Sequence, residues 1–307
     1  MPKLVNFGSL CIDWVYQVPN LVAAGETITS TARAVHAGGK GLNQSIAASR
    51  AGAEVLHFGA VGDDGQTLVA VLEEAGVSSD GVTRVDTASG HAVIQVDSSG
   101  QNAIVIFPGA NRQIPAQQQE RAISVLQPGD WLLLQNETND IAAMLTQAAA
   151  KEASVAINLA PADDRIHEYP LQLAKLLIVN EVEAMALAKC SDLSQAWVAL
   201  RDRFPGTDLV LTLGRQGLWC VQAETKESIA LGAHEVTAVD ETAAGDAFIG
   251  YLMAGLLADK ALPLALAEAS AAGALTVTQP GASAAIPLRD QVEAMLEKEQ
   301  LSSRLLS

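Results

Sequence analysis

The sequence predicts an α/β fold: a doubly wound, mostly parallel sheet flanked by helices, with a small antiparallel β lid. Two observations lead to this class. Short runs rich in aliphatic and β-branched residues alternate along the chain with segments of helical periodicity, and strands that alternate with helices form parallel sheets covered on both faces. In addition, two regions of period-two alternation interrupt this order, which indicates strands outside the main sheet.

The strands of the main sheet are expected in short, almost wholly apolar runs, which are typical of strands buried on both faces. These runs are KLVNF (3–7), VLHFGAV (55–61), WLLLQ (131–135), SVAINL (154–159), KLLIV (175–179) and DLVLTL (208–213). Segments of helical periodicity lie between them, over 42–52, 67–76, 140–152 and 194–204. A later helix over 261–277 contains Pro263 and Glu268, so we expect it in the core rather than across a membrane.

The β lid is expected from the two interrupting regions, 12–36 and 91–107. In each, period-two segments are joined by turn residues such as DSSGQN, which predicts strands over 12–18, 26–36, 91–97 and 103–107. No internal repeat, low-complexity tract or hinge-like linker divides the chain. We therefore expect a single domain over 1–307, with the lid assembled from both insertions.

Composition limits the classes of partner. The chain of 307 residues carries 19 basic and 35 acidic residues, a net charge of −16, which repels nucleic acid and anionic membranes. A small anion remains possible, because a local pocket of backbone N–H groups can bind one against the global field. The three cysteines lie far apart in sequence without metal-binding spacing, which favours reduced thiols in the cytoplasm.

The stretch DETAAGDAFIG (240–250) places small residues beside carboxylates at the start of an apolar helix. Asp246 falls in the first turn, and Ala243, Ala244 and Gly245 leave the backbone N–H groups before it accessible. Such a helix start attracts anions, because its unpaired N–H groups and its dipole are both positive. A simpler interpretation is that Asp246 caps the helix.

Ten fragments, in order along nearly the whole chain, resemble the ribokinase-like (PfkB) family of carbohydrate kinases. The two longest are HAGGKGLNQSIAASRAGA (36–53), which resembles the family's G-G-K-G-x-N-Q signature, and DETAAGDAF (240–248), which resembles its D-T-x-x-A-G-D-x-F signature. The others are GSLCID (8–13), GETIT (25–29), VGDDG (61–65), LLLQNE (132–137), NLAPA (158–162), NEVEA (180–184), TLGRQG (212–217) and PGASAAIP (280–287). The resemblance implies an ATP-dependent kinase that phosphorylates a primary hydroxyl of a pentose-like sugar.

The resemblance also implies how the phosphoryl group is handled. Asp246 would be the general base, and the backbone of Ala243, Ala244 and Gly245 would stabilise the transferring phosphoryl group. The residues matching the magnesium and nucleotide elements are Asn180, Glu183, Thr212, Gly214 and Gly217. Read without the family, Asn180 and Glu183 form a helix capping box and the two glycines belong to a hairpin turn.

Other matching positions imply a sugar site and a potassium site. The substrate-binding positions correspond to Cys11, Asp13, Gly39, Lys40, Asn43 and Glu137. Cys11 stands where the family usually has asparagine. Without the resemblance, Lys40 would be interpreted as a solvated loop lysine and Glu137 as an acid that precedes a helix. The positions of a monovalent cation site correspond to Asp240 and Thr242, with backbone carbonyls from Gly281 to Ala285. Ala285 stands where a serine is usual.

The resemblance further implies a homodimer formed through the β lid. Two readings of a different class stay open: a nicotinamide dehydrogenase, and a catalytically silent sugar or nucleotide sensor on the same fold. The first lacks a GxGxxG turn, and GGKG is not followed by the Ser or Thr of a Walker A loop. Within the kinase reading, a nucleoside, a deoxysugar or another ketose or hexose remains an alternative substrate.

Overall fold

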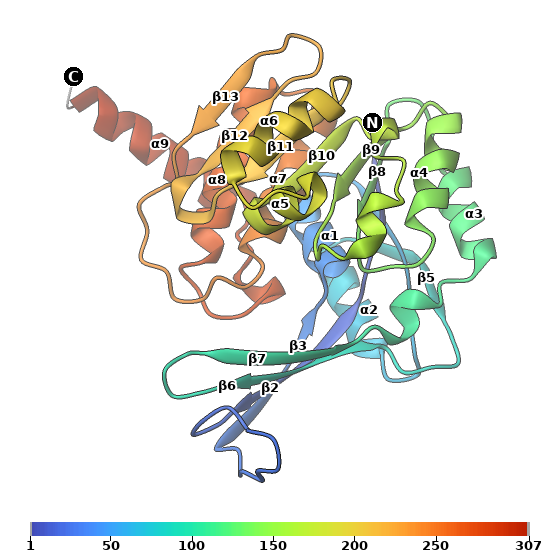
Figure 1. The fold of residues 1–307 in the computed structure, drawn as a ribbon, viewed down its shortest axis with the longest axis vertical. Coiled ribbons are helices and arrows are strands. Elements are labelled where there is room, and N and C mark those ends of the chain that lie inside the picture. Colours follow the sequence, from blue (N-terminus) through green and yellow to red (C-terminus); the bar gives the residue numbers. More distant parts are fainter. Residues whose placement is uncertain (1, 306–307) are drawn as a thin grey trace.

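The structure is a computed structural model that describes residues 2–305, with the side chains of residues 2–299. Within this part of the chain, nine strands form the main sheet (Figure 1). In spatial order they are β13 (Ser228–Leu231), β12 (Leu218–Val221), β11 (Asp208–Thr212), β10 (Leu176–Asn180), β9 (Ser154–Asn158), β8 (Trp131–Gln135), β1 (Leu4–Phe7), β4 (Val55–Val61) and β5 (Ser78–Arg84). Neighbours from β11 to β5 pair in parallel, and β12 and β13 are antiparallel.

Helices cover both faces of this sheet, because strands buried on both sides present apolar side chains in both directions. One core packs the helices α1 (Lys40–Arg50), α2 (Gln66–Glu74), α7 (Ala244–Leu257), α8 (Leu262–Thr276) and α9 (Arg289–Leu305) against one face. The other packs α3 (Ala116–Ser124), α4 (Ile141–Ala150), α5 (Glu181–Ala188) and α6 (Leu193–Arg203). Short 3₁₀ turns are η1 (Gly109–Arg112), η2 (Asp164–His167), η3 (Leu171–Leu173), η4 (Gly214–Gln216) and η5 (Ser283–Ala285). The doubly wound class is thereby confirmed.

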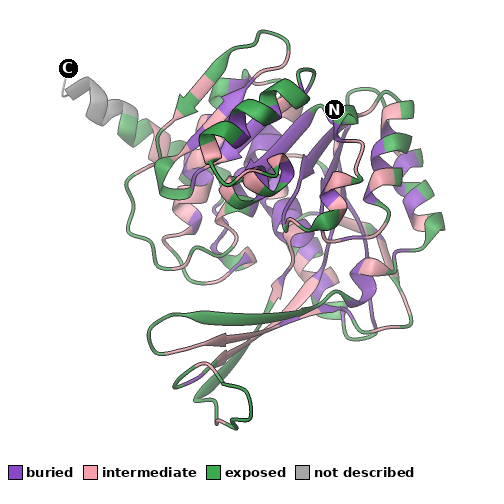
Figure 2. Cartoon of the chain, in the orientation of Figure 1, coloured by how far each residue is buried: buried purple, intermediate pink, exposed green. Residues whose placement is uncertain are grey.

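Four further strands form a second sheet, the lid, which extends away from the α/β body (Figures 1 and 2). Its order is β3 (Ala32–Gly38), β2 (Cys11–Gln17), β6 (Gly90–Val96) and β7 (Asn102–Phe107). The two outer pairs are antiparallel. The inner pair β2–β6, which joins the two insertions, is parallel.

The expected lid strand over 26–36 is wrong at its beginning, since residues 26–31 lie outside β3. They belong to a loop in which the Glu26 carboxylate accepts a hydrogen bond from the Ala23 N–H at 2.9 Å. A local side-chain bond of this kind competes with strand pairing.

The strand order reverses between β1 and β8, from which successive strands are added in opposite directions. Ligands of open α/β sheets bind at the carboxyl ends of the strands beside such a switch point. The carboxyl ends of β1, β8, β9 and β10 therefore define where a site is expected. Across residues 2–305 we find no helix with the length and apolar content needed to cross a membrane.

Candidate functional site

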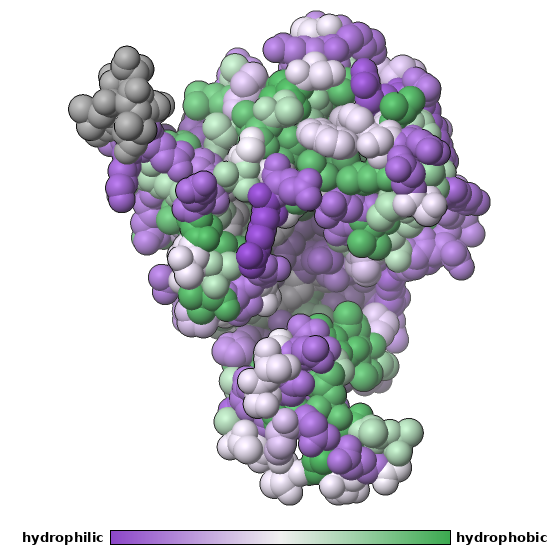
Figure 3. Space-filling model, turned by 60° about the vertical axis from the view of Figure 1, so that its left-hand side comes forward, coloured by the Kyte–Doolittle hydropathy of each residue, from purple (hydrophilic) through white to green (hydrophobic). Residues whose placement is uncertain are grey.

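A pocket of about 220 Å³ lies at these strand ends, beside the start of α7. Its lining includes Lys40, Asn180, Glu183, Thr212, Ala243, Gly245 and Asp246. The chain thus brings together residues that are up to about two hundred positions apart in sequence. Ala244, Gly214 and Gly217 are not among the lining residues, although Ala244 lies between two of them in sequence. In the space-filling view, a recess separates the α/β body from the lid (Figure 3).

Asp246 lies in the first turn of α7 and is only 8% exposed. Its carboxylate is held by α1: Asn43 Nδ2 donates to Oδ2 and Gln44 Nε2 donates to Oδ1, each at 2.9 Å. Burial raises the pKa of Asp246, while the nearby Lys40 charge and the two amide donors oppose that rise. The capping interpretation is wrong, because the N-cap is Ala243 and the helix has no side-chain cap.

The backbone before Asp246 has the form of an anion site. Ala243 adopts a left-handed conformation with φ 61°, which turns the chain sharply into α7. A Cβ added at Gly245 would meet no atom within 4 Å, so the space beside this residue is open. An uncapped helix start of this kind presents N–H groups and positive dipole to a ligand.

Lys40 and Glu183 bring opposite charges to the same pocket. Burial alone would lower the pKa of Lys40, but the carboxylates of Asp246, Glu137 and Glu183 hold it above its usual value. Glu183 is 4% exposed, and burial raises its pKa against the opposing bonds from Asn180 and the charge of Lys40. The solvated-lysine reading of Lys40 therefore does not hold.

Asn180 and Glu183 form the expected capping box of α5. Asn180 N donates to Glu183 Oε2 and Asn180 Nδ2 donates to Oε1, each at 2.9 Å. Each Glu183 oxygen keeps a second lone pair, which can accept from water on a cation. In the described residues no cluster of three or more His, Cys, Asp or Glu side chains could bind a metal directly.

The nucleotide-turn residues occupy the hairpin between β11 and β12. Gly217 has φ 92°, and a Cβ there would lie 1.9 Å from Leu231 O, so packing alone requires this glycine. Gly214 has φ 52° with open space beside it. The hairpin reading holds for both glycines, while Thr212 at the end of β11 reaches the pocket.

The residues matched to the sugar site surround the root of the lid. Glu137 Oε2 accepts from Ser9 Oγ and, at 3.2 Å, from Lys40 N. Burial, and then the charge of Glu137, raise the pKa of Asp13 to about 6. Asn43 Oδ1 is buried and accepts no hydrogen bond from the described residues, so it can accept one from a ligand hydroxyl.

Gly39 closes this wall because no larger residue fits. Its φ is 96°, and a Cβ there would lie 3.0 Å from Cys11 N and from Ser9 O. The Cys11 thiol is largely buried, and burial followed by the charges of Asp13 and Glu137 raises its pKa, so it stays protonated.

The residues matched to the potassium site form a turn before α7. Asp240 Oδ1 accepts from Thr242 N at 2.9 Å and from Thr242 Oγ1 at 2.6 Å, and Asp240 Oδ2 accepts from Gly281 N at 2.9 Å. These bonds hold the turn against the segment that contains Gly281 and Ala285. Burial would raise the pKa of Asp240, but the hydrogen bonds from Thr242 and Gly281 have the larger effect and lower it.

Sequence reasoning missed three polar residues of the site, namely Ser9, Gln44 and Asn158. Gln44 is fully buried; its Nε2 reaches Asn158 Oδ1 at 3.4 Å, and its Oε1 accepts from Gln135 Nε2 at 2.8 Å. A signal was available, because each residue lies within one of the fragments that resemble the family, GSLCID, HAGGKGLNQSIAASRAGA and NLAPA.

Comparison with known proteins agrees with this geometry. Residues 1–289 match the pfkB family carbohydrate kinase model. A ribokinase of Haemophilus influenzae is 34% identical over 306 residues, covering 96% of this chain and 98% of that protein. The structure of a Cryptococcus neoformans ribokinase in complex with ADP matches with a TM-score of 0.86 and 32% identity, covering 96% of this chain and 100% of that one. An Arabidopsis thaliana ribokinase complexed with ribose and ATP gives 0.85 and 26%, covering 96% and 98%. The chain belongs to the pfkB family of carbohydrate kinases.

Proposed function

We propose that this protein transfers the γ-phosphate of ATP to a primary hydroxyl of a pentose, with Asp246 as general base. The observation that carries the proposal is the buried Asp246 carboxylate, fixed by Asn43 and Gln44 at the uncapped start of α7. Phosphoryl transfer depends on alignment and charge stabilisation more than on a strong base. A fixed carboxylate beside open N–H groups supplies both.

Each wall of the site then has a task. The Ala243–Gly245 backbone and Lys40 stabilise charge on the transferring phosphoryl group, and Thr212, Gly214 and Gly217 receive the nucleotide. Mg²⁺ bound with ATP would neutralise phosphate charge. Glu183, whose carboxylate is held in place by Asn180, would bind this ion through water. Asp13, Gly39, Asn43 and Glu137 bind sugar hydroxyls; the Arabidopsis thaliana ribokinase is complexed with ribose.

The test of the base is Asp246→Asn, which keeps the side-chain shape but removes the proton acceptor. We expect kcat to fall about 10²–10⁴-fold with ATP binding retained. The matched control is Asp290→Asn, an exposed acid in the first turn of α9, which should leave kcat unchanged. Full activity of Asp246→Asn would remove the base role.

Sugar-dependent ADP release in the wild type separates a kinase from a dehydrogenase, which changes NADH absorbance, and from a silent sensor, which does neither.

Cys11 favours a second candidate substrate, a sugar lacking one hydroxyl. The half-buried, protonated Cys11 thiol donates and accepts hydrogen bonds weakly, so a hydroxyl facing it loses about 1–3 kcal/mol, roughly 5- to 150-fold in kcat/KM. We expect Cys11→Asn to improve ribose relative to 2-deoxyribose in a panel of pentoses, deoxypentoses, hexoses and nucleosides. A wild type that prefers ribose, with no gain from asparagine, would leave the kinase but dismiss the deoxysugar.

Potassium is a further proposed cofactor. The bonded turn of Asp240 and Thr242 precedes the anion site directly, so a cation between this turn and the carbonyls of Gly281 to Ala285 would stiffen that site. We expect potassium chloride to raise kcat above sodium or choline chloride at equal ionic strength. Equal rates in the three salts would contradict this.

We also propose that the lid pairs with the lid of a second copy to form a homodimer, and that the protein works in the cytoplasm. Cys11, Cys190 and Cys220 are all unpaired thiols, which fits a reducing compartment.

A further inference from the structure

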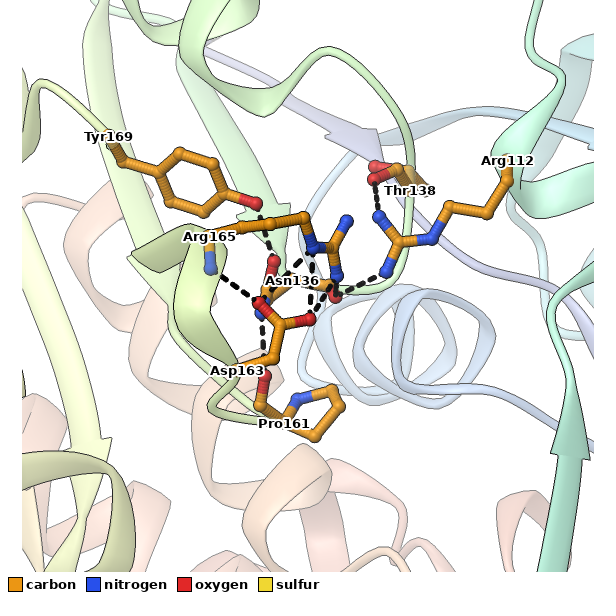
Figure 4. Close-up of polar contacts among 7 residues, drawn as sticks. All are labelled: Arg112, Asn136, Thr138, Pro161, Asp163, Arg165 and Tyr169. Atoms are coloured by element: carbon orange, nitrogen blue, oxygen red, sulfur yellow. Dashed lines mark hydrogen bonds and ion pairs between the residues drawn. The ribbon is translucent and has the colours of Figure 1, made fainter. Parts of the chain in front are cut away.

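The loop after β8, residues 136–140, carries Glu137 and is held by one arginine on both sides of it. Arg112 Nη1 donates to Thr138 O at 2.6 Å, and Arg112 Nη2 donates to Asn136 O at 3.2 Å (Figure 4). The two nitrogens of a planar guanidinium have a fixed separation. A single side chain therefore sets the spacing of the carbonyls that precede and follow Glu137.

Asn136 is itself fixed, so Arg112 binds a rigid support. Asn136 Nδ2 donates to Pro161 O at 2.6 Å, and Tyr169 Oη donates to Asn136 Oδ1 at 2.6 Å. Arg165 Nη2 adds a weaker bond to Asn136 O at 3.3 Å (Figure 4). Asn136 and Thr138 are fully buried, whereas Glu137 between them is partly exposed and directs its carboxylate to Ser9 and Lys40.

Such a support suits Glu137 because its negative charge acts on a second carboxylate, Asp13, whose pKa it helps to raise. Two like charges near one another repel, and a loose loop would relieve the repulsion by moving Glu137 away. Bonds from a charged donor to backbone carbonyls are stronger than neutral ones and oppose that movement.

The same 3₁₀ turn also holds residues 9–11, the segment beside Glu137. Arg112 ends η1, which follows the lid strand β7 after Pro108. Its neighbour Asn111, 2% exposed, accepts from Leu10 N and donates to Leu10 O, both at 2.9 Å. Leu10 stands between Ser9 and Cys11. One turn at the root of the lid is thus bonded both to the loop that carries Glu137 and to the segment that carries Ser9 and Cys11.

We propose that Arg112 is a positioning residue for the sugar: it sets the Glu137 carboxylate against the substrate. This rests on the proposed function. Arg112 bonds the backbone on both sides of Glu137 and acts through that residue, so its effect belongs to sugar binding and not to ATP binding.

The test compares Arg112→Met, which loses both bonds, with Arg112→Lys, which can keep one. We expect the sugar KM to rise about 10- to 100-fold for methionine and less for lysine, with the ATP KM unchanged. Arg121→Met is the matched control, because Arg121 Nη1 also donates to a backbone carbonyl, Asp80 O at 2.8 Å, on an exposed surface. It should leave both KM values as in the wild type.

A double-mutant cycle separates positioning from general support of the fold. In a Glu137→Ala background, Arg112→Met should raise the sugar KM no further, because its intermediary is gone. Equal multiplicative losses in both backgrounds, an equal rise in the ATP KM, or an unchanged sugar KM would overturn the proposal. If the methionine variant does not fold, the lysine variant in the same cycle decides. A wild type that phosphorylates no sugar would instead reject the proposed function.

Discussion

At the scale of single residues, Asp13 shows what the site costs the fold. Its pKa is raised to about 6, first by burial and then by Glu137, so the ionised form is less stable in the folded chain than in the unfolded one. A carboxyl group whose folded pKa is raised loses stability as the pH rises from its ordinary pKa through the folded value. Near neutral pH, Asp13 therefore destabilises the protein, as functional residues often do.

Asp13→Asn removes this penalty, since asparagine does not ionise. At about pH 7.5 we expect the variant to be more stable by about 1–2 kcal/mol, a discounted conversion of the two-unit shift because Asp13 is partly exposed. Near pH 3 and below the gain should approach zero, because Asp13 is then largely protonated in both the folded and the unfolded chain. Denaturant unfolding across this range measures it, with a raised sugar KM expected alongside. A gain of equal size at both pH values would contradict the electrostatic origin.

The sequence anticipated individual site residues better than it anticipated their partners. Asp246 and Glu183 could be named because their neighbours form local patterns, a helix start and a capping box. Gln44 could not be assigned to Asp246, because the two residues are 202 positions apart in sequence and only tertiary packing brings them together. The Arg112 bonds were equally hidden, because their acceptors are backbone carbonyls, which carry no sequence signal.

At the scale of elements, the close approach of α1 and α7 determines where Asp246 meets its amide partners. Gly250 of α7 lies against α1: a Cβ there would be 2.3 Å from Ala47 Cβ and 2.7 Å from Gln44 O. These helices cannot lie this close with a larger residue at the crossing. Gly250 is one turn beyond Asp246, so its lack of a side chain allows the bonds from Asn43 and Gln44.

Gly250→Ala should push α1 and α7 apart. We expect a loss of about 1–3 kcal/mol in unfolding free energy from overpacking, together with a lower kcat, because the carboxylate loses its donors. Gly255→Ala is the control: it crowds the same helix against α8, where a Cβ would lie 2.7 Å from Ala265 Cβ, so it should lose stability but keep kcat. If both variants lose kcat equally, the α1–α7 contact has no special part.

The elements themselves divide into those with strong periodicity and those without it. Strands β4 and β8 fall at the expected residues, because buried parallel strands are continuous apolar runs. The edge strands β5 (SSDGVTR) and β13 (SIAL) were not expected. Their half-polar or very short sequences carry no such signal, and pairing with a neighbour determines them. The parallel pairing of β2 with β6 likewise follows from tertiary assembly and not from local sequence.

At the scale of the whole molecule, the lid leaves apolar surface uncovered. Its outer strand β7 exposes Ile104 by 50%, Val105 by 70% and Ile106 by 60%, and hydrophobic surface gathers on the lid in the space-filling view (Figure 3). Successive residues of a strand face opposite sides, so both faces of this edge are apolar. An exposed apolar edge strand favours association unless another surface covers it.

The dimer proposed above would supply that surface. We expect light scattering at micromolar concentration to give twice the chain mass of 32.0 kDa, and Val105→Lys to shift the protein to monomer, because a charge at this position would be buried in the interface. Val182→Lys is the matched control, since Val182 is 68% exposed on α5, outside the lid, and should leave the dimer intact.

A lid that a second copy holds in place also closes more readily over the sugar and excludes water from the phosphoryl group. The Val105→Lys monomer should therefore show a raised sugar KM and more ATP hydrolysis without sugar transfer. A wild type that stays monomeric at micromolar concentration would reject the dimer, and closure of the lid would then depend on the substrate alone.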